Sequence, residues 1–274
     1  MNSALQHIAF IGGGNMASAT IGGLIRQGMA PHQITVVEPF ADTAARLTKD
    51  FGVTVLPEAG PALAAAQLVV WAVKPQVFKE AAGPVSAHTR QALHLSVAAG
   101  IRTDSICAWL DTQRLVRSMP NTPALVGQGM TALYACPAVS EAEKANVEQV
   151  IATTGQFLWV AQESQLDAVT ALSGSGPAYV FFFLEAMTEA GVGMGLSAEQ
   201  AYRLAVATFS GASSLAAAST EPPEVLRQRV TSKGGTTYAA ITAMENAGIK
   251  PAFVRAMQAA EARARELGDE FGKA

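Results

Sequence analysis

Two glycine-rich segments of this chain have the residue types and the spacing to bind anions. The first, FIGGGNMA at residues 10–17, lies near the N-terminus, and the second, TSKGGTT at residues 231–237, lies in the last quarter of the 274-residue sequence. Glycines in such segments let backbone N–H groups converge on an anion without obstruction by side chains. A helix that starts at the segment adds the positive end of its dipole. The chemistry of the chain should therefore involve two anionic groups.

The first segment has the spacing of a dinucleotide-binding loop. Gly12, Gly14 and Ala17 follow the pattern G-x-G-x-x-A, between an apolar run typical of a strand and a stretch of helical periodicity. Gly12 permits the tight turn, Gly14 lets a pyrophosphate approach the backbone, and Ala17 keeps the helix close to the sheet. The alternative is an ordinary glycine-rich turn between a strand and a helix, but the position at the start of the chain favours a dinucleotide site.

An acidic residue follows the second predicted strand. Glu38, in TVVEPF, stands about 20 residues after the glycine loop, where a carboxylate accepts hydrogen bonds from the adenosine ribose hydroxyls. Such a carboxylate repels a 2′-phosphate, so Glu38 alone favours NADH over NADPH. Arg46, further along, can soften that preference. The alternative is a solvated loop acid with no ligand.

The elements that must position these residues alternate between strands and helices in the first half of the chain. Continuous apolar runs suit a parallel sheet that is covered on both faces, and the stretches 17–28 and 41–52 between them have helical periodicity. The predicted strands are HIAFIG at 7–12, QITVVEP at 33–39, LVVWAVKP at 68–75, ALHLSVAAG at 92–100, RLVRSMP at 114–120 and GMTALYA at 129–135. This repeating βα pattern predicts a Rossmann domain.

The second half of the chain is predicted to be helical. After GQFLWV at 155–160, only segments compatible with helices remain, among them SAEQ at 197–200, a capping-box pattern, and the proline-led TEPPEVL at 220–226. Candidate helix ends are Gly191, Gly248 and Gly268. We therefore predict an α/β protein with an N-terminal Rossmann dinucleotide-binding domain, residues 1–162, followed by an all-helical domain, residues 163–274.

The composition excludes several classes of function. A net charge of −3 without a lysine or arginine block gives no patch for nucleic acid or an anionic membrane surface, and no segment reads as a transmembrane helix. The first residues lack a signal-peptide pattern, so we expect a cytoplasmic protein. Hydrophobic residues make up 50% and charged residues 15% of the chain, which a large subunit interface would explain.

Histidine and cysteine positions exclude further chemistry. The four histidines all fall at or before His94, and no G-x-S-x-G elbow is present, so a hydrolase is excluded. Cys107 and Cys136 belong to no metal or redox spacing, and we expect both to be buried and reduced. No metal site is predicted.

Five further stretches, taken in order, resemble the pyrroline-5-carboxylate reductase family over nearly the whole chain. They are AVKPQ at 72–76, SVAAGI at 96–101, RSMPNTPALVGQG at 117–129, ALSGSGPAYVF at 171–181 and VTSKGGTTYAAI at 230–241. The resemblance implies reduction of 1-pyrroline-5-carboxylate to L-proline with hydride from NADPH or NADH. It also implies a helical domain that interlocks with a second copy as a homodimer, often assembled into a ring of dimers, with the imine site between the cofactor domain and partner helices.

The resemblance assigns the second glycine loop to the substrate carboxylate. It implies catalytic roles for Thr237, which hydrogen-bonds the ring nitrogen, for Ser232 and for Lys74. The residues implied to bind the substrate are Gly234, Gly235, Thr236, Ser175 and Asn121. The alternatives are a capped turn between two helices for the loop, and a turn-former that satisfies its own backbone for Asn121.

The cofactor residues combine the motif with the resemblance. They are Gly12, Gly14, Asn15, Met16, Glu38, Ala72, Val73, Lys74, Pro75, Ala98 and Ala99. Lys74 and Pro75 end a strand at the sheet edge where ligands bind, although a plain surface lysine is the alternative. The resemblance implies that SVAAG at 96–100 lines the nicotinamide ribose by backbone contacts, with Ala98 and Ala99 small enough to admit the ring.

Two departures and two rival functions stay open. Lys233 stands where the family usually has proline, and Ala59 lies near where relatives often have asparagine beside the adenosine. Another imine or keto reductase of the 6-phosphogluconate-dehydrogenase-like group, such as a β-hydroxyacid dehydrogenase, is disfavoured because no lysine of the second half sits in the G-x-x-x-K setting of such enzymes. A non-catalytic nucleotide sensor is disfavoured because Ser232, Gly235 and Thr237 are retained.

Overall fold

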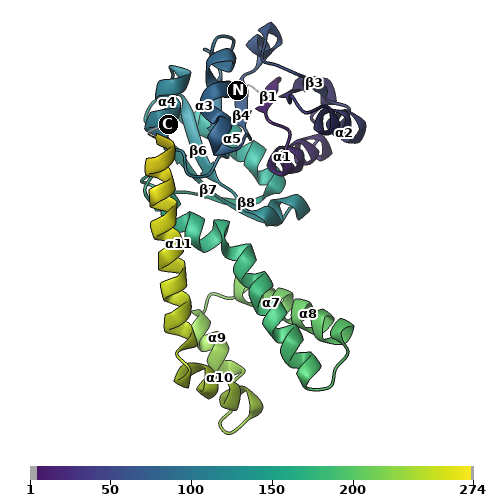
Figure 1. Ribbon diagram of the computed structural model, residues 1–274, viewed down its shortest axis with the longest axis vertical. Helices are drawn as coiled ribbons and strands as arrows, with labels where there is room; N and C mark the ends of the chain where they lie inside the picture. The colour runs from purple at the N-terminus through teal and green to yellow at the C-terminus, as the bar shows by residue number, and fades with distance from the viewer. Residues whose placement is uncertain (1–4, 273–274) are drawn as a thin grey trace. The chain divides into compact units, whose positions relative to one another are not determined.

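The computed structural model describes residues 5–272, which form two compact units (Figure 1). The first unit comprises residues 5–175 together with residues 260–272, and the second comprises residues 176–259. The domain boundary that the sequence predicts between residues 162 and 163 stays a prediction. The Rossmann architecture of the first unit and the helical nature of the rest are confirmed.

The first unit is built on an eight-stranded sheet with the order β3-β2-β1-β4-β5-β6-β7-β8. Its strands are β1 (Ile8–Ile11), β2 (Ile34–Val37), β3 (Thr54–Leu56), β4 (Leu68–Trp71), β5 (Leu93–Ser96), β6 (Leu115–Met119), β7 (Gly129–Ala135) and β8 (Gly155–Trp159). Strands β1 to β6 pair in parallel, whereas β7 runs antiparallel to β6 and parallel to β8.

The helices of this unit cover both faces of the sheet. They are α1 (Asn15–Arg26), α2 (Ala41–Phe51), α3 (Pro75–Ser86), α4 (Thr103–Leu110), α5 (Glu141–Ile151) and α6 (Gln165–Val169). The chain moves one way across the sheet from β1 to β3 and the other way from β4 to β6. Because such crossovers are right-handed, α1 and α2 lie on one face, and α3 and α4 lie on the other. The direction changes between β1 and β4, which is where dinucleotides bind in this fold.

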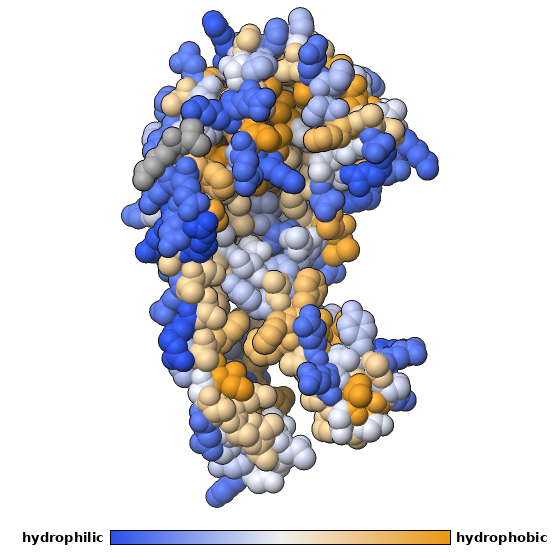
Figure 2. Space-filling view, viewed as in Figure 1, coloured by the Kyte–Doolittle hydropathy of each residue, from blue (hydrophilic) through white to orange (hydrophobic). Residues whose placement is uncertain are grey.

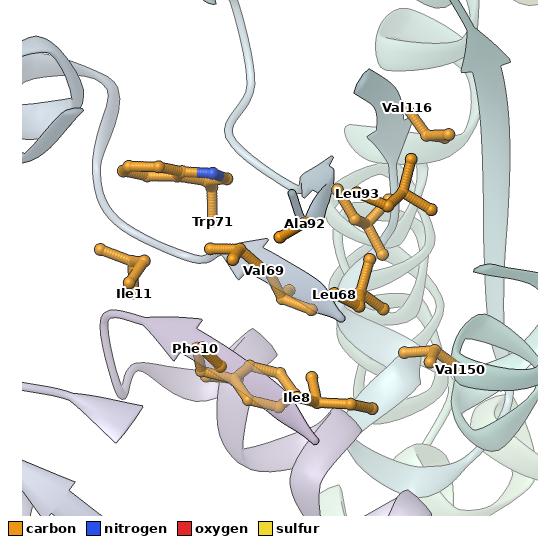
Figure 3. Packing of buried hydrophobic residues seen from close by; sticks show 14 of the residues in the cluster. Ile8, Phe10, Ile11, Leu68, Val69, Trp71, Ala92, Leu93, Val116 and Val150 are labelled. Atoms are coloured by element: carbon orange, nitrogen blue, oxygen red, sulfur yellow. The ribbon is translucent and has the colours of Figure 1, made fainter. Parts of the chain in front are cut away.

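The core of the first unit consists of the central strands and the helix residues that face them (Figure 3). All four residues of β1 and of β4 are buried, as a sheet covered on both faces requires. Trp71 stacks on Phe78 with ring centroids 4.4 Å apart, and both are fully buried. Burial of a large apolar side chain stabilises the fold by about 1.5–3 kcal/mol.

Two features of the sheet differ from the sequence prediction. Strand β3 was not predicted, because it has only three residues and none of them is fully buried. The sequence predicts a strand of a parallel sheet at 129–135; β7 does pair in parallel with β8, but it is antiparallel to β6, so the prediction is wrong for that pairing. Residues 120–128 hold one 3-10 turn, η3 (Thr122–Val126), and a parallel return needs a crossover of a dozen or more residues.

The helices that follow are α7 (Gly176–Gly193), α8 (Ala198–Ala217), α9 (Pro223–Arg229), α10 (Thr236–Asn246) and α11 (Ile249–Gly272), which continues into the first unit. The capping box at Ser197 is confirmed, because its hydroxyl accepts the N–H of Gln200 and the Gln200 side chain accepts the N–H of Ser197. The helix end at Gly248 is also confirmed by its φ of 66°.

The helix ends predicted at Gly191 and Gly268 are wrong. Both glycines lie inside helices, α7 and α11, and they serve close packing. A Cβ on Gly191 would lie 2.7 Å from the Ala201 Cβ, and a Cβ on Gly268 would lie 3.0 Å from the Arg102 Nε. A glycine near a predicted helix end can therefore mark a close approach of another element.

The helices of the second unit carry much exposed apolar surface. Figure 2 shows this surface in orange and tan over the second unit. On α7, Phe181 is 59% exposed and Phe182 is 66% exposed. Exposed apolar patches of this kind mark interaction surfaces. No helix among residues 5–272 is both long and apolar enough to cross a bilayer.

Candidate active site

The dinucleotide loop lies at the carboxyl end of β1, at the predicted edge of the sheet. Gly12 has a φ of 91°, and a Cβ there would lie 2.8 Å from the Ala72 carbonyl oxygen, so only glycine fits. Beside Gly14 the space is open, since a Cβ there would meet no atom within 4 Å. Helix α1 begins at Asn15, which leaves the N–H groups of Asn15 and Met16 free of intrahelical partners. This geometry fits a pyrophosphate.

Glu38 is buried and bound to the loop. Its Oε2 accepts the N–H of Gly13 over 2.8 Å, and its Oε1 accepts the N–H of Phe40 over 2.9 Å. The side chain is 6% exposed, so it is not the solvated loop acid of the alternative. Gly13 was not among the residues predicted for the loop, although a Cβ there would lie 2.4 Å from Leu47 Cδ1. The run of three consecutive glycines was the feature of the sequence that could have identified Gly13.

The next two predicted segments end β4 and β5 at the same edge. Lys74 is exposed and precedes α3, whose first residue is Pro75, and Ala72 and Val73 are half-buried. After β5, Ala98 is buried and donates its N–H to Ser96 Oγ over 3.3 Å, and Ala99 is exposed. Since β1, β4 and β5 are parallel neighbours, these segments lie along one edge with the glycine loop.

Asn121 follows β6 at this edge and joins distant segments. Its Oδ1 accepts the N–H of Met130 over 2.9 Å, and its Nδ2 lies 3.3 Å from both the carbonyl oxygen and the hydroxyl of Ser173. The side-chain amide of Asn121 therefore bonds other segments and not its own backbone, unlike the turn-former of the alternative. Ser175 ends a π-helical turn (Thr170–Gly174), donating its N–H to the Thr170 carbonyl oxygen over 2.8 Å before α7 begins.

The second glycine loop leads into α10, in the second unit. Gly234 has a φ of 75°, and the N–H of Gly235 donates to the Ser232 carbonyl oxygen over 3.0 Å. A Cβ on Gly235 would lie 2.7 Å from Ser232 Oγ. Helix α10 starts at Thr236 without a side-chain cap, so the N–H groups of Thr236 and Thr237 have no intrahelical partner. They remain available to an anion.

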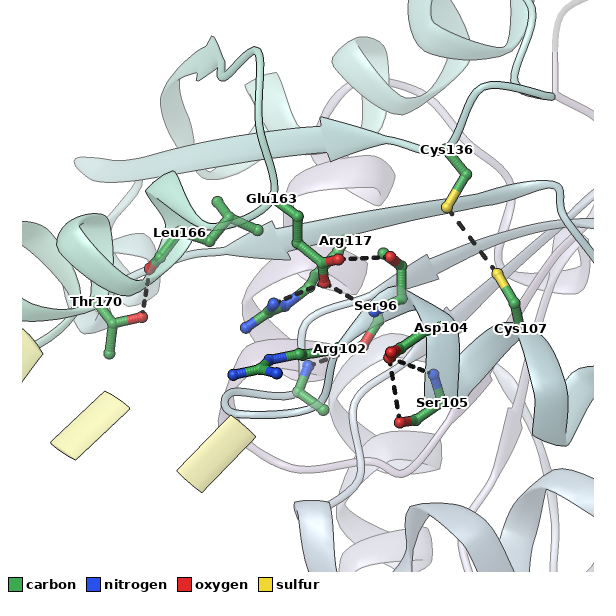
Figure 4. Close-up of polar contacts among 12 residues, drawn as sticks. Ser96, Arg102, Asp104, Ser105, Cys107, Arg117, Cys136, Glu163, Leu166 and Thr170 are labelled. Atoms are coloured by element: carbon green, nitrogen blue, oxygen red, sulfur yellow. Dashed lines mark hydrogen bonds and ion pairs between the residues drawn. The ribbon is translucent and has the colours of Figure 1, made fainter. Parts of the chain in front are cut away.

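A charged cluster that the sequence did not predict lies in the first unit (Figure 4). Arg117 of β6 has a side chain that is 5% exposed, and its Nη1 lies 2.8 Å from Glu163 Oε1. Both residues line a cavity of about 380 Å³ together with Asp167. Burial raises the pKa of Asp167 above its ordinary value, against the lowering effect of nearby arginines. No spacing in the sequence predicts this cluster, because Arg117 lies 46 positions away from Glu163 in the chain.

The remaining buried titratable groups form no metal site. Cys107 and Cys136 are free and buried, as expected, with their Sγ atoms 4.0 Å apart. His94 accepts the Trp71 Nε1–H at its Nδ1 over 3.0 Å, and burial lowers the pKa of His94 to about 4. Within residues 5–272, no group of three or more histidine, cysteine or acidic side chains could hold a metal ion.

A Rossmann sheet with a dinucleotide loop and a buried acid after β2 defines a nicotinamide-dependent oxidoreductase. Residues 7–100 match the family model described as NADP oxidoreductase coenzyme F420-dependent. Residues 163–267 match the model described as pyrroline-5-carboxylate reductase dimerisation, which supports a homo-oligomer.

Similar proteins narrow this class. The pyrroline-5-carboxylate reductase of Pseudomonas aeruginosa is 44% identical over 268 residues, covering 97% of this chain and 98% of the relative. A pyrroline-5-carboxylate reductase structure from Coxiella burnetii has a TM-score of 0.90 and 37% identity, covering 96% of this chain and 98% of that one. The Plasmodium falciparum pyrroline carboxylate reductase, with NADP bound, has a TM-score of 0.86 and 25% identity, covering 98% and 99%.

The chain belongs to the pyrroline-5-carboxylate reductase family. It is an NAD(P)H-dependent oxidoreductase that reduces pyrroline-5-carboxylate to proline.

Proposed function

We propose that NAD(P)H binds along the carboxyl edge of the sheet in the first unit. Gly12, Gly14 and the free N–H groups of Asn15 and Met16 hold the pyrophosphate, and Glu38 receives the adenosine ribose. The segments 72–75 and 98–99 hold the nicotinamide half, with Lys74 and Pro75 at the start of α3. The open space beside Gly14 supports this placement.

The substrate carboxylate binds at the loop 231–237. The observation that supports this role most directly is the uncapped start of α10, where Thr236 and Thr237 present free N–H groups behind two glycines. Gly234 and Gly235 keep side chains away from the anion, and Ser232 adds a hydroxyl. Thr237 supplies the hydroxyl that contacts the ring nitrogen. Ser175 and Asn121 complete the proposed set of substrate residues.

The reaction does not require any single side chain to be a potent catalyst. The bound dihydronicotinamide supplies the hydride, which adds to the imine carbon while the ring nitrogen ends as a protonated amine. The residues of this chain orient the two reactants, which turns an encounter into an internal step. The Thr237 hydroxyl can donate to or accept from the ring nitrogen as its protonation changes. Lys74 and Ser232 contribute polar groups that fix this orientation.

The working assembly is a homodimer, with a ring of dimers as the larger form. Exposed Phe181 and Phe182 on α7 support this, because neighbouring phenylalanines point to different sides of a helix and need a partner to cover them. The mean hydropathy of +0.23 supports it as well.

The deciding experiment is a spectrophotometric assay that follows NADH and NADPH oxidation with pyrroline-5-carboxylate. Oxidation that depends on this imine supports the proposed function. Oxidation only with a β-keto acid would instead assign the chain to the β-hydroxyacid dehydrogenases. If both cofactors bind and neither is oxidised with any of these compounds, the chain is a nucleotide sensor. A variant with Gly14→Asp serves as the inactive control, because its carboxylate would fill the space of the pyrophosphate.

A further inference from the structure

Glu163 receives hydrogen bonds from two segments that are far apart in the sequence. Its Oε1 accepts the backbone N–H of Thr103 over 2.7 Å and the Nη1–H of Arg117 over 2.8 Å, and its Oε2 accepts the Thr103 hydroxyl over 2.6 Å. Figure 4 shows the Glu163 carboxylate directed toward Arg117. One side chain thus joins the start of α4 to the middle of β6.

Both segments adjoin loops of the proposed nicotinamide site: one begins where its loop ends, and the other leads into its loop. Thr103 follows the loop 97–102, which carries Ala98 and Ala99. Arg117 stands two residues before Met119, where β6 ends and the chain runs on to Asn121. The hydrogen bonds of Glu163 go to Thr103 and Arg117 rather than to Ala98, Ala99 or Asn121, so its effect on the reaction acts through the position of these loops.

The spacing of the loops is held at two levels. Inside the sheet, the Ser118 hydroxyl donates to the Ser96 carbonyl oxygen over 2.8 Å and joins β5 to β6 just before the loops begin. Outside the sheet, the Glu163 carboxylate joins the far end of the first loop to the strand that leads into the second. Together these bonds fix both ends of the 97–102 loop against β6.

Burial makes the outer connection stiff. The Arg117 side chain is 5% exposed and the Glu163 side chain is 22% exposed, so solvent reaches Glu163 from the cavity but hardly reaches Arg117. Hydrogen bonds to a carboxylate are shorter and stronger than neutral ones, particularly where the surroundings are poor in water. Without the carboxylate, the buried Arg117 guanidinium would lose its hydrogen-bonded partner, with Asp167 as the other acid that lines the cavity.

We propose that Glu163 is a positioning residue for hydride transfer, because its carboxylate sets the spacing of the two loops that receive the nicotinamide end of NAD(P)H. This rests on the proposed function of the sheet edge. The adenosine end is held by different segments, residues 12–16 and Glu38, which Glu163 does not touch. We therefore expect Glu163 to affect the binding of the nicotinamide half of the cofactor and not the binding of the adenosine half.

The test compares Glu163→Gln and Thr103→Val with the wild type. Glu163→Gln keeps the size of the side chain but removes its charge, and Thr103→Val removes the hydroxyl that donates to Oε2 and to Cys136 while it keeps the backbone N–H bond to Oε1. Glu141→Gln is the matched control, because Glu141 pairs with Lys144 on an exposed part of α5. For each protein, kcat and KM are measured together with the Kd for NADH and for ADP-ribose, which lacks the nicotinamide.

We expect the substitution at Glu163 to change the Kd for NADH but not the Kd for ADP-ribose. Glu163→Gln should lower kcat by at least about tenfold and weaken NADH binding, since a misplacement of 1 Å can cost about 100-fold in rate. Its Kd for ADP-ribose should stay within about twofold of the wild-type value, which a general loss of structure would not leave intact. Thr103→Val should show a smaller change in the same direction, and Glu141→Gln should show none.

Three outcomes would overturn the proposal. Unchanged kcat and NADH binding in both variants would show that the spacing does not depend on the carboxylate. Equal weakening of NADH and ADP-ribose would show a role in the fold alone. If Glu163→Gln does not fold, an unchanged Thr103→Val enzyme would decide against it. A wild type that oxidises no cofactor with pyrroline-5-carboxylate would refute the proposed function instead, while the comparison of NADH with ADP-ribose still tests Glu163.

Discussion

The N–H of Gly13 donates to the Glu38 carboxylate over 2.8 Å, which ties the acid after β2 to the glycine loop after β1. The other oxygen of Glu38 accepts the N–H of Phe40, so the side chain is fixed from both sides. Each carboxylate oxygen can accept a further hydrogen bond. The acid can therefore shape the loop and still receive ribose hydroxyls, and in the proposed cofactor site it lies where a 2′-phosphate would approach.

Glu38→Ser should shift the cofactor preference toward NADPH. The change removes the charge that repels the 2′-phosphate, and the ratio of kcat/KM for NADPH to that for NADH should rise by about tenfold or more, which corresponds to ~1.4 kcal/mol. Steady-state kinetics with both cofactors give this ratio. Glu38→Asp, which keeps the charge, is the control and should leave the ratio close to the wild-type value. An unaltered ratio in Glu38→Ser would rule out Glu38 as a determinant of cofactor choice.

Thr237→Ala should lower turnover with little effect on cofactor binding. The loss of a hydroxyl that bonds a charged ring nitrogen costs about 1.5–3 kcal/mol, or roughly 10- to 100-fold in kcat/KM for pyrroline-5-carboxylate. The Kd for NADH, measured by fluorescence, should stay within about twofold of the wild-type value. Thr237→Ser restores the hydroxyl and should recover most of the activity. Full turnover in Thr237→Ala would remove this residue from the proposed site.

The parts of this structure that follow from neighbouring residues could be predicted from the sequence. The turn at Gly12 and the capping box at Ser197 are local, because each depends on residues that lie within a few positions. The continuous burial of β1 and β4 likewise follows from their apolar runs. Local chemistry thus predicted the Rossmann domain, the helical second half and the dinucleotide loop.

Features that depend on distant segments could not be predicted in the same way. The Glu163 carboxylate meets Thr103 and Arg117 across 60 and 46 positions, and no spacing in the sequence marks these pairs. The antiparallel direction of β7 depends on how the chain returns after β6 rather than on the composition of the strand. The glycines at 191 and 268 read as helix ends because the packing partners that require them lie elsewhere in the sequence.

The exposed phenylalanines of α7 give a prediction about assembly. Wild-type protein should be at least a dimer at micromolar concentration in light scattering, because Phe181 and Phe182 are 59% and 66% exposed in the single chain. Replacement of both by aspartate should shift the mass toward the monomer, since burying an unpaired carboxylate in an apolar interface is strongly unfavourable. Glu141→Gln, at the exposed start of α5, should keep the wild-type mass. A stable wild-type monomer would contradict the dimer.

Asp167→Asn should leave the protein as stable as the wild type at pH 7, or more stable. Burial raises the pKa of Asp167 above its unfolded value, so the ionised form is disfavoured in the folded state. The stabilising contribution of such an acid is present below its unfolded pKa and is lost as the pH rises through the folded pKa. Asparagine avoids this loss. Thermal unfolding at pH 7 checks the prediction, and a clearly lower Tm for Asp167→Asn would contradict it.

The Trp71–His94 pair should make the fold sensitive to acid between about pH 6.5 and pH 4. Burial lowers the pKa of His94 from 6.5 to about 4, so the unfolded chain takes up a proton in this window and the folded chain does not. Stability is therefore complete above the unfolded pKa and falls as the pH drops toward the folded one, by roughly 3 kcal/mol at most.

His94→Asn tests this assignment, because its amide oxygen can still accept the Trp71 Nε1–H while the side chain no longer titrates. Urea unfolding across this range should show a flatter pH dependence for His94→Asn than for the wild type, even if its stability at pH 7 is lower. His88→Asn is the control, because His88 is only half-buried and follows α3. This variant should keep the wild-type slope. Equal slopes for the wild type and His94→Asn would show that other groups cause the acid sensitivity, since only the variant at residue 94 removes the proton uptake that burial makes costly.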